Sequence, residues 1–175
     1  MPMLRKYTPL LLAALIVLTI TTVSSHGEKP LPEGVIADKV IAEKHARHMM
    51  LLSRGRVLKK YKISLGRNSK GPKVRAGDGK TPEGIYVIDS RNPRSRYHLS
   101  LHISYPNLSD IKRAKQLGVS PGGDIMIHGI RKGFGWLGPL HRLVIWTKGC
   151  IAVTNKEIEE IWRAVPNGTQ IEIRP

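Results

Sequence analysis

The chain has 175 residues and one cysteine, and its 29 Lys and Arg against 13 Asp and Glu give a formal charge of +16 at pH 7. A single cysteine excludes a small fold held together by internal disulfides. The basic excess predicts either an anionic partner, such as acidic lipid or an acidic wall polymer, or only a soluble surface. Aromatic residues make up 5% of the chain and are not interleaved with basic ones, which argues against nucleic acid.

Residues 1–25 have the composition of a signal peptide or N-terminal anchor. Arg5 and Lys6 precede an apolar run over residues 10–23, and Ser25 offers a small residue for cleavage. The run of about 14 residues is shorter than the roughly 20 that span a bilayer, so cleavage is favoured and an uncleaved membrane anchor is the alternative. No cysteine follows the run, which excludes a lipoprotein anchor. We expect an exported, periplasmic or otherwise extracytoplasmic protein that carries +14 after cleavage, since Arg5 and Lys6 are the only charges removed.

The remaining chain is long enough for one domain with its own core. Residues 26–38 are rich in Pro and Gly and predict a linker, and residues 39–175 predict the domain. In the first half of the domain, apolar runs bounded by turn residues predict strands, with a hairpin turn at residues 53–56 and a polar loop at 66–84. The strands expected there are 40–43, 48–52, 57–65 and 85–89.

The second half of the domain mixes strands with short helices. Alternation predicts a strand at 97–103, and a helix at 109–117 would have Ser109 as its N-cap and Gly118 after its end. A buried strand at 124–128 precedes a helix that begins with capping-box spacing from Thr154 to Glu157 and ends before residues 166–168. A last strand is expected at 169–173. The fold class is therefore mainly β, with two or three short helices.

Cys150 is the candidate nucleophile. It follows Gly149, and a lone thiol in an exported chain has no intramolecular disulfide partner. An unperturbed thiol is mostly protonated at neutral pH, so a nucleophilic cysteine needs a base nearby. The alternative is an inert, buried cysteine, which is the commoner role of a free thiol.

His128 is the candidate base, because it ends the predicted strand 124–128 in the same half of the chain as the cysteine. A general base must itself be oriented by a third group, and the carbonyl of Gly129 is next to the ring. Gly149 would let backbone amides approach a substrate carbonyl closely, as an oxyanion hole requires. Together these residues indicate an enzyme that forms a covalent intermediate on Cys150.

Several short motifs resemble the L,D-transpeptidase catalytic domain of bacterial cell-wall enzymes. They are Ile127-His128-Gly129, Thr147-x-Gly149-Cys150-Ile151, the ending Gly168-Thr169-x-Ile171-x-Ile173, and Thr81-Pro82-Glu83-Gly84-Ile85-Tyr86. The resemblance covers roughly residues 39–175. It implies a sandwich-like or barrel-like β-domain and an acyl-enzyme on Cys150.

In that family's chemistry, Cys150 would attack the carbonyl of the diamino acid at the third position of a peptidoglycan stem peptide and release the terminal D-alanine. His128 would act as base and then as acid, oriented by the Gly129 carbonyl, and the amides of Gly149 and Cys150 would bind the oxyanion. An amine of a second stem would accept the acyl group. The resemblance leaves open a hydrolase of the same family, including one that removes wall-linked lipoprotein.

Three features depart from the family pattern. Lys148 stands where histidine is common, Ala152 stands where many members have an arginine for the substrate carboxylate, and the segment between His128 and Cys150 is longer. A missing arginine removes a bidentate clamp. Residues that could replace it are Lys148, Arg142 and Arg131. The longer segment could form a lid on which Trp136 covers the substrate.

We expect the substrate to be contacted by Thr147, Lys148, Trp146 and Trp136. Core packing is the alternative for Trp136 and Trp146 and the expected role of Trp162. A non-catalytic, basic wall-binding module is the other functional class that fits. A zinc site of His128, His141 and Cys150 lacks the paired ligand spacing of known sites, so we expect no metal and no cofactor.

Overall fold

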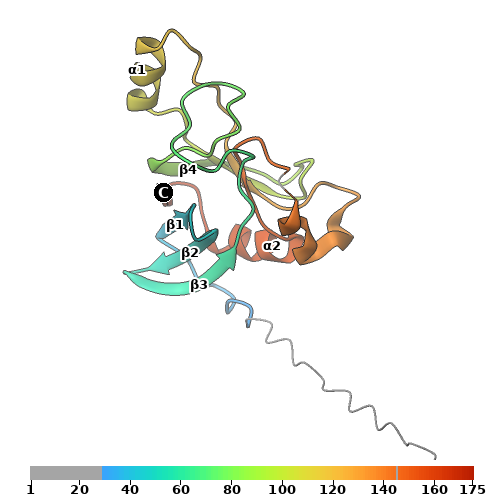
Figure 1. Cartoon of the computed structure of the whole chain (residues 1–175). Coiled ribbons are helices and arrows are strands. Elements are labelled where there is room, and N and C mark those ends of the chain that lie inside the picture. Colours follow the sequence, from blue (N-terminus) through green and yellow to red (C-terminus); the bar gives the residue numbers. More distant parts are fainter. Residues whose placement is uncertain (1–28, 145) are drawn as a thin grey trace, which may run out of the picture.

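The computed structural model describes residues 29–144 and 146–175 of the chain, so the predicted signal peptide or anchor lies outside the described residues. The fold is mainly β, as expected (Figure 1). The elements follow in the order β1 (Lys39–Glu43), β2 (His48–Ser53), β3 (Arg56–Lys62), β4 (Gly84–Asn92), β5 (Ser100–Ile103), α1 (Leu108–Gln116), β6 (Met126–His128), the 3-10 helix η1 (Gly135–Leu143), β7 (Ile151–Ala152), α2 (Asn155–Ala164) and β8 (Gln170–Arg174).

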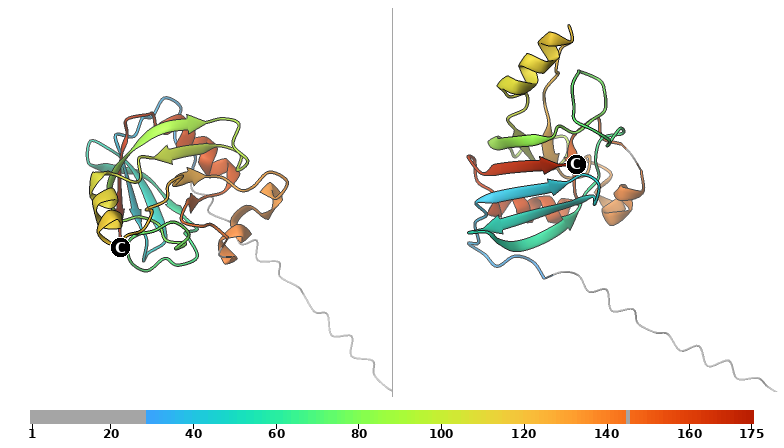
Figure 2. Two further views of the ribbon diagram at one scale, coloured as in Figure 1. Left: turned by 90° about the horizontal axis from the view of Figure 1, so that it is seen from above. Right: turned by 60° about the vertical axis from the view of Figure 1, so that its left-hand side comes forward.

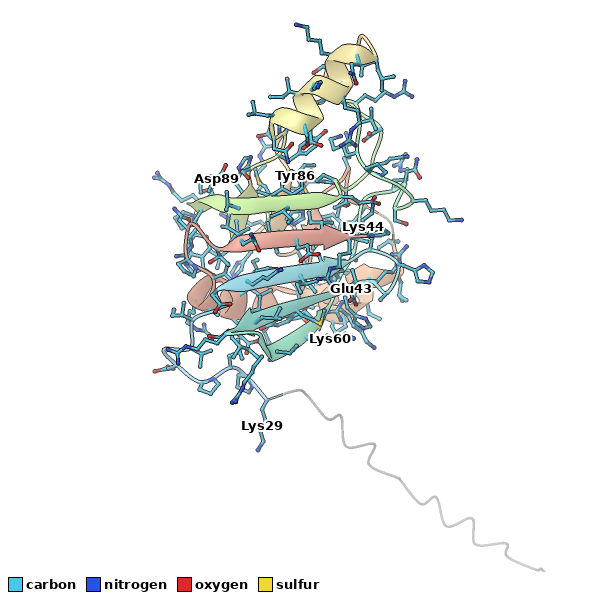
Figure 3. The ribbon with its side chains drawn as sticks, turned by 90° about the vertical axis from the view of Figure 1, so that its left-hand side faces the viewer. Lys29, Glu43, Lys44, Lys60, Tyr86 and Asp89 are labelled. Carbon is cyan, nitrogen blue, oxygen red and sulfur yellow. The ribbon has the colours of Figure 1, made fainter. Side chains whose placement is uncertain are left out.

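The strands form one eight-stranded sheet in the order β3-β2-β1-β8-β4-β5-β6-β7. Figure 3 shows β4, β8, β1, β2 and β3 side by side across one face. The pairs are antiparallel except β1 with β8 and β6 with β7. An isolated bridge between Ser64, just after β3, and Ala152 in β7 links the two ends of the sheet, which gives the fold its barrel-like character.

The core lies between the curled sheet and α2 (Figure 2). Alternate residues of the strands point inward, as the period of two requires. Helix α2 begins with the capping box predicted for Thr154 and Glu157, and its apolar stripe packs into this core. The stripe consists of Ile158, Ile161, Ala164 and Val165. Each fully buried isoleucine contributes about 1.5–3 kcal/mol.

Helix α1 lies apart from α2, beyond the β4 side of the sheet (Figures 1 and 3). The Tyr86 hydroxyl on β4 donates to Asp110 of α1 over 2.9 Å and ties this helix to the sheet. The cap predicted for this helix is wrong. Asn107, not Ser109, accepts from the first-turn amides, because its side chain is placed one residue before the helix and reaches two of them.

Three element boundaries also differ from the sequence prediction. The strand expected at 57–65 ends at Lys62, because the chain then leaves β2 and Ser64 pairs with Ala152. The strands expected from residues 97 and 124 begin later, because His98 and Asp124 have positive φ angles of 67° and 56° that no extended strand adopts. The predicted linker is described only from residue 29, and its Ala37 is buried with its amide bonded to Ala164.

Helix η1 was not predicted from the sequence. It lies in the long segment between β6 and β7, and the non-helical backbone of Gly138, just before Pro139, interrupts it. No helix within residues 29–144 and 146–175 is long and apolar enough to cross a membrane.

Candidate active site

The candidate nucleophile and the candidate base lie on neighbouring strands of the sheet. Strand β6 pairs in parallel with β7, and His128 is in register with Ala152. Cys150 is two residues before Ala152, at the entry to β7. The sheet therefore places the two residues on adjacent strands, with Cys150 at the level of Met126, although 21 positions lie between them in the sequence.

The His128 ring is buried, with 3% of the residue exposed. Its Nδ1 lies 2.7 Å from the Gly129 carbonyl oxygen. Because a carbonyl can only accept, Nδ1 carries the proton and Nε2 keeps a free lone pair. Burial lowers the pKa of His128 to about 4, against the opposing effect of the Gly129 hydrogen bond. The imidazole is therefore neutral at pH 7, the form that a general base needs.

Two aromatic rings hold the His128 imidazole in place. Tyr97 lies with its ring centroid 4.5 Å away, and Trp146 makes an edge contact at 5.4 Å. Trp146 also contacts the buried ring of His141 at 6.0 Å. The site is thus walled by aromatic groups, which exclude water from the base.

The Cys150 thiol is partly buried and donates to the Asp124 carbonyl over 3.5 Å. Burial raises the pKa of Cys150, and a backbone hydrogen bond at Met126 and the charge of Lys73 oppose this rise only in part. The thiol is therefore protonated at neutral pH and bonded to Asp124 rather than to His128. For His128 to take the thiol proton, the Cys150 side chain would have to turn from Asp124 toward the imidazole.

Gly149 is required by the packing around the cysteine. Its φ is +127°, and a Cβ there would lie 2.5 Å from the Lys80 carbonyl oxygen. Gly66 is equally crowded, since its own Cβ would lie 2.8 Å from the Gly149 nitrogen. The loop at 66–84 therefore packs directly on the backbone before Cys150. No side chain larger than hydrogen fits at either glycine.

The four residues expected to contact the substrate differ in their burial and in their partners. Thr147 is buried, and its hydroxyl donates to the Cys150 carbonyl over 2.9 Å, which closes the turn that carries the thiol. Trp146 lies against His128, and Lys148 is exposed. Trp136 on η1 is 78% exposed, which excludes core packing for it. Trp162 packs partly buried against the core, as expected, under the Arg91 guanidinium.

The model of the L,D-transpeptidase catalytic domain, the YkuD family, matches residues 37–173. The chain belongs to this family.

Among similar proteins, the Escherichia coli (strain K12) protein named "Putative L,D-transpeptidase YafK" is 33% identical over 111 residues, which cover 62% of this chain and 37% of YafK. Pgp2 of Campylobacter jejuni, described as a helical cell shape determining protein, superposes with a TM-score of 0.59 at 26% identity, over 84% of this chain and 51% of Pgp2. Bd1075 of Bdellovibrio bacteriovorus has a TM-score of 0.54 at 26% identity, over 83% of this chain and 52% of its own. The chain spans about half or less of these relatives.

One feature of this L,D-transpeptidase domain that the sequence did not reveal is a buried ion pair in the loop at 66–84. Lys73, 4% exposed, donates to Asp78 over 2.9 Å, and the other Asp78 oxygen accepts from the Val74 amide at 2.9 Å. Asp78 also accepts from the Lys80 amide over 3.0 Å. Because the Lys80 carbonyl lies against Gly149, the pair fixes the loop beside the nucleophile. A lysine in a Gly-rich polar loop predicts only a solvated charge.

A second missed residue is Asn155, the first residue of α2. Its side-chain oxygen accepts from the Ile130 amide over 2.8 Å. A Cβ on Gly129 would lie 2.8 Å from that oxygen, and one on Gly135 would lie 2.7 Å from the amide nitrogen. Asn155 therefore holds the chain that follows His128 and carries the Gly129 carbonyl. The signal available in the sequence was its place directly after the helix N-cap.

The residues that could bind a substrate carboxylate differ in availability. Arg142 donates to both oxygens of Glu157, at 2.6 and 2.7 Å, and to the Lys62 carbonyl, so its charge is already paired. Within the described residues, no group of three or more His, Cys, Asp and Glu side chains is placed to hold a metal ion. His141 bonds Ser64 through Nδ1 at 3.4 Å instead.

Proposed function

We propose that this chain is a cysteine-dependent L,D-transpeptidase that acts on peptidoglycan stem peptides outside the cytoplasm. The observation that carries the proposal is the neutral His128 ring, oriented by the Gly129 carbonyl at 2.7 Å on the strand beside Cys150. Family membership supports the reaction class. Export rests on the composition of residues 1–25.

The first half-reaction forms a thioester. His128 Nε2 takes the thiol proton as the sulfur attacks the carbonyl between the third stem residue and the terminal D-alanine. The amides of Gly149 and Cys150 bind the oxyanion. A donor placed in this way typically lowers the activation barrier by about 2.7–4 kcal/mol. The tetrahedral intermediate then collapses, and the protonated His128 gives its proton to the leaving amine of D-alanine.

The second half-reaction transfers the acyl group. An amine of another stem attacks the thioester carbonyl, and His128 accepts a proton from that amine. The thiolate leaves and recovers this proton, which restores the starting state. Thr147 supports both steps by holding the turn that carries Cys150. Trp146 supports them by keeping water from the imidazole, and exposed Lys148 and Trp136 would contact the parts of the substrate farther from the thiol.

A hydrolase with the same acyl-enzyme is the second candidate function, because the sequence retains every group needed for attack by water. Removal of wall-linked lipoprotein is one such reaction. Pgp2, a cell-shape protein, is similar over most of this chain, so a role in cell shape is part of this proposal. A non-catalytic wall-binding module is the alternative of a different class.

The test is a product assay by mass spectrometry with a purified stem tetrapeptide, whose diamino-acid amine also serves as the acceptor. A transpeptidase yields the joined peptide and releases D-alanine. A hydrolase releases D-alanine and yields free tripeptide without the joined peptide. A binding module yields neither, and Cys150→Ala defines the background. In cells, overexpression of a transpeptidase adds 3→3 muropeptides, whereas loss of lipoprotein-bound muropeptides indicates the hydrolase.

A further inference from the structure

A hollow of about 330 Å³ lies beside the candidate base, between η1 and the segments that precede β5 and follow β6. Its walls are mostly apolar and aromatic, formed by Tyr97, Ile130, Arg131, Phe134, Leu137, His141, Val144 and Trp146. Tyr97 and Trp146 are the two rings that hold His128, so the hollow is one aromatic ring away from the imidazole. The distance from the His128 ring to the hollow is therefore about the length of one or two peptide residues.

Arg131 is the only cation among the lining residues that carries a permanent charge, and its exposed guanidinium makes no ion pair or hydrogen bond within the described part of the chain. Burial lowers the pKa of His141 to about 4, so that ring is neutral at pH 7. Arg142 is held by Glu157 and Lys62, and Lys148 does not line the hollow. Of the three residues that could replace the arginine missing at Ala152, Arg131 alone is both free and part of the wall of this hollow.

The wall of the hollow also has unused hydrogen-bonding capacity. Trp146 Nε1 and His141 Nε2 are buried and have no partner among the described residues. Buried polar groups in proteins are nearly always paired. A ligand oxygen that enters beside these rings would accept from the Trp146 Nε1–H, and also from His141 Nε2 in the tautomer that carries the proton there.

We propose that this hollow is a specificity site for a substrate residue with an apolar stem and a carboxylate, in which Arg131 pairs the carboxylate. The inference rests on the proposed function, because it assigns part of the stem peptide to a place beside His128. The apolar walls take the stem of the residue, and the guanidinium at the rim binds the carboxylate in a bidentate manner. The carboxylate belongs either to the C-terminus of the stem peptide or to the side chain of its diamino acid.

A binding measurement tests this inference independently of catalysis. Kd is measured for three tetrapeptides on Cys150→Ala protein with and without Arg131→Gln. One peptide has both carboxylates free, one is amidated at its C-terminus, and one is amidated on the diamino-acid side chain. A charge-assisted pair contributes about 1.5–3 kcal/mol. Arg131→Gln should therefore raise the Kd of the peptide with both carboxylates free by at least about tenfold. The amidated peptide that Arg131→Gln leaves unchanged identifies which carboxylate the arginine binds.

Lys132→Gln is the matched control, because Lys132 is the exposed neighbouring cation and does not line the hollow. The inference is overturned if Arg131→Gln and Lys132→Gln weaken all three peptides equally, since that is the effect of general surface charge. Failure of the proposed function has a different signature. In that case the wild-type protein binds peptides in an Arg131-dependent way but forms no acyl-enzyme.

Discussion

Replacement of Asp78 by asparagine should destabilise the domain by about 2–3 kcal/mol at pH 7. Burial alone would raise the pKa of Asp78, but hydrogen bonds from Val74, Lys73, Lys80 and Arg75 outweigh it and lower the pKa from 3.8 to about 2. That difference corresponds to about 2 kcal/mol of folding free energy. Part of this free energy comes from the buried Lys73 ammonium, which the substitution leaves without its counter-charge.

The pH dependence has a definite sign. Because the folded-state pKa of Asp78 is lowered, its stabilisation is fully present above the unfolded value near 4 and is lost as the pH falls toward 2. Urea denaturation of wild type and Asp78→Asn at pH 7, 4 and 2.5 measures this. The two free energies of unfolding should differ most at pH 7, and the difference should be clearly smaller at pH 2.5, although not yet zero.

The control is Asp89→Asn on β4 (Figure 3), whose carboxylate pairs with His102 but is 41% exposed. Exposed pairs contribute about 0–1 kcal/mol, so this variant should stay close to wild type. The reasoning is refuted if Asp78→Asn is as stable as Asp89→Asn at pH 7, or if its deficit does not shrink on acidification.

Three further predictions concern the residues around the thiol. Gly149→Ala should lower the free energy of unfolding by at least about 2 kcal/mol and remove most acylation. The reason is that its Cβ would lie 2.5 Å from the Lys80 oxygen, on a backbone with φ +127°. A thermal unfolding midpoint equal to that of the wild type would contradict this. The rate of Cys150 acylation should fall on acidification only near pH 4, where His128 becomes protonated, and a pH–rate profile with an acid limb near 6.5 would show that the base is not buried. Asn155→Ala should lower the free energy of unfolding by about 1–3 kcal/mol, because it leaves the Ile130 amide unpaired, whereas Asn155→Asp keeps an acceptor and should lower it less. Equal free energies of unfolding for these two variants would show that the bond to Ile130 does not stabilise the domain.

Most strands could be predicted from the sequence, because alternation and turn residues act locally. The capping box at Thr154 was equally readable, since both partners lie within four residues. Helix η1 could not be read in the same way, because Gly138 and Pro139 interrupt its pattern. The Asn107 cap was missed because Ser109, two residues later, offers the same chemistry.

The same distinction between local patterns and long-range contacts applies to the candidate site. The pairing of His128 with Cys150 in one site stays a prediction from the motifs, and the structure shows that they lie on adjacent strands. The aromatic walls depend on long-range contacts such as Tyr97 with His128. The Lys73–Asp78 pair was invisible because burial of a loop charge is decided by what packs over it. The engagement of Arg142 depends on Glu157, which no local pattern connects to it.

The most direct test of the account is the intact mass of the protein after exposure to a carbapenem. Wild type and His141→Ala should gain one adduct, whereas Cys150→Ala and His128→Ala should gain none. A folded wild-type protein without an adduct would contradict the role of Cys150. Labelling that survives in His128→Ala but disappears in His141→Ala would show that His141 is the base.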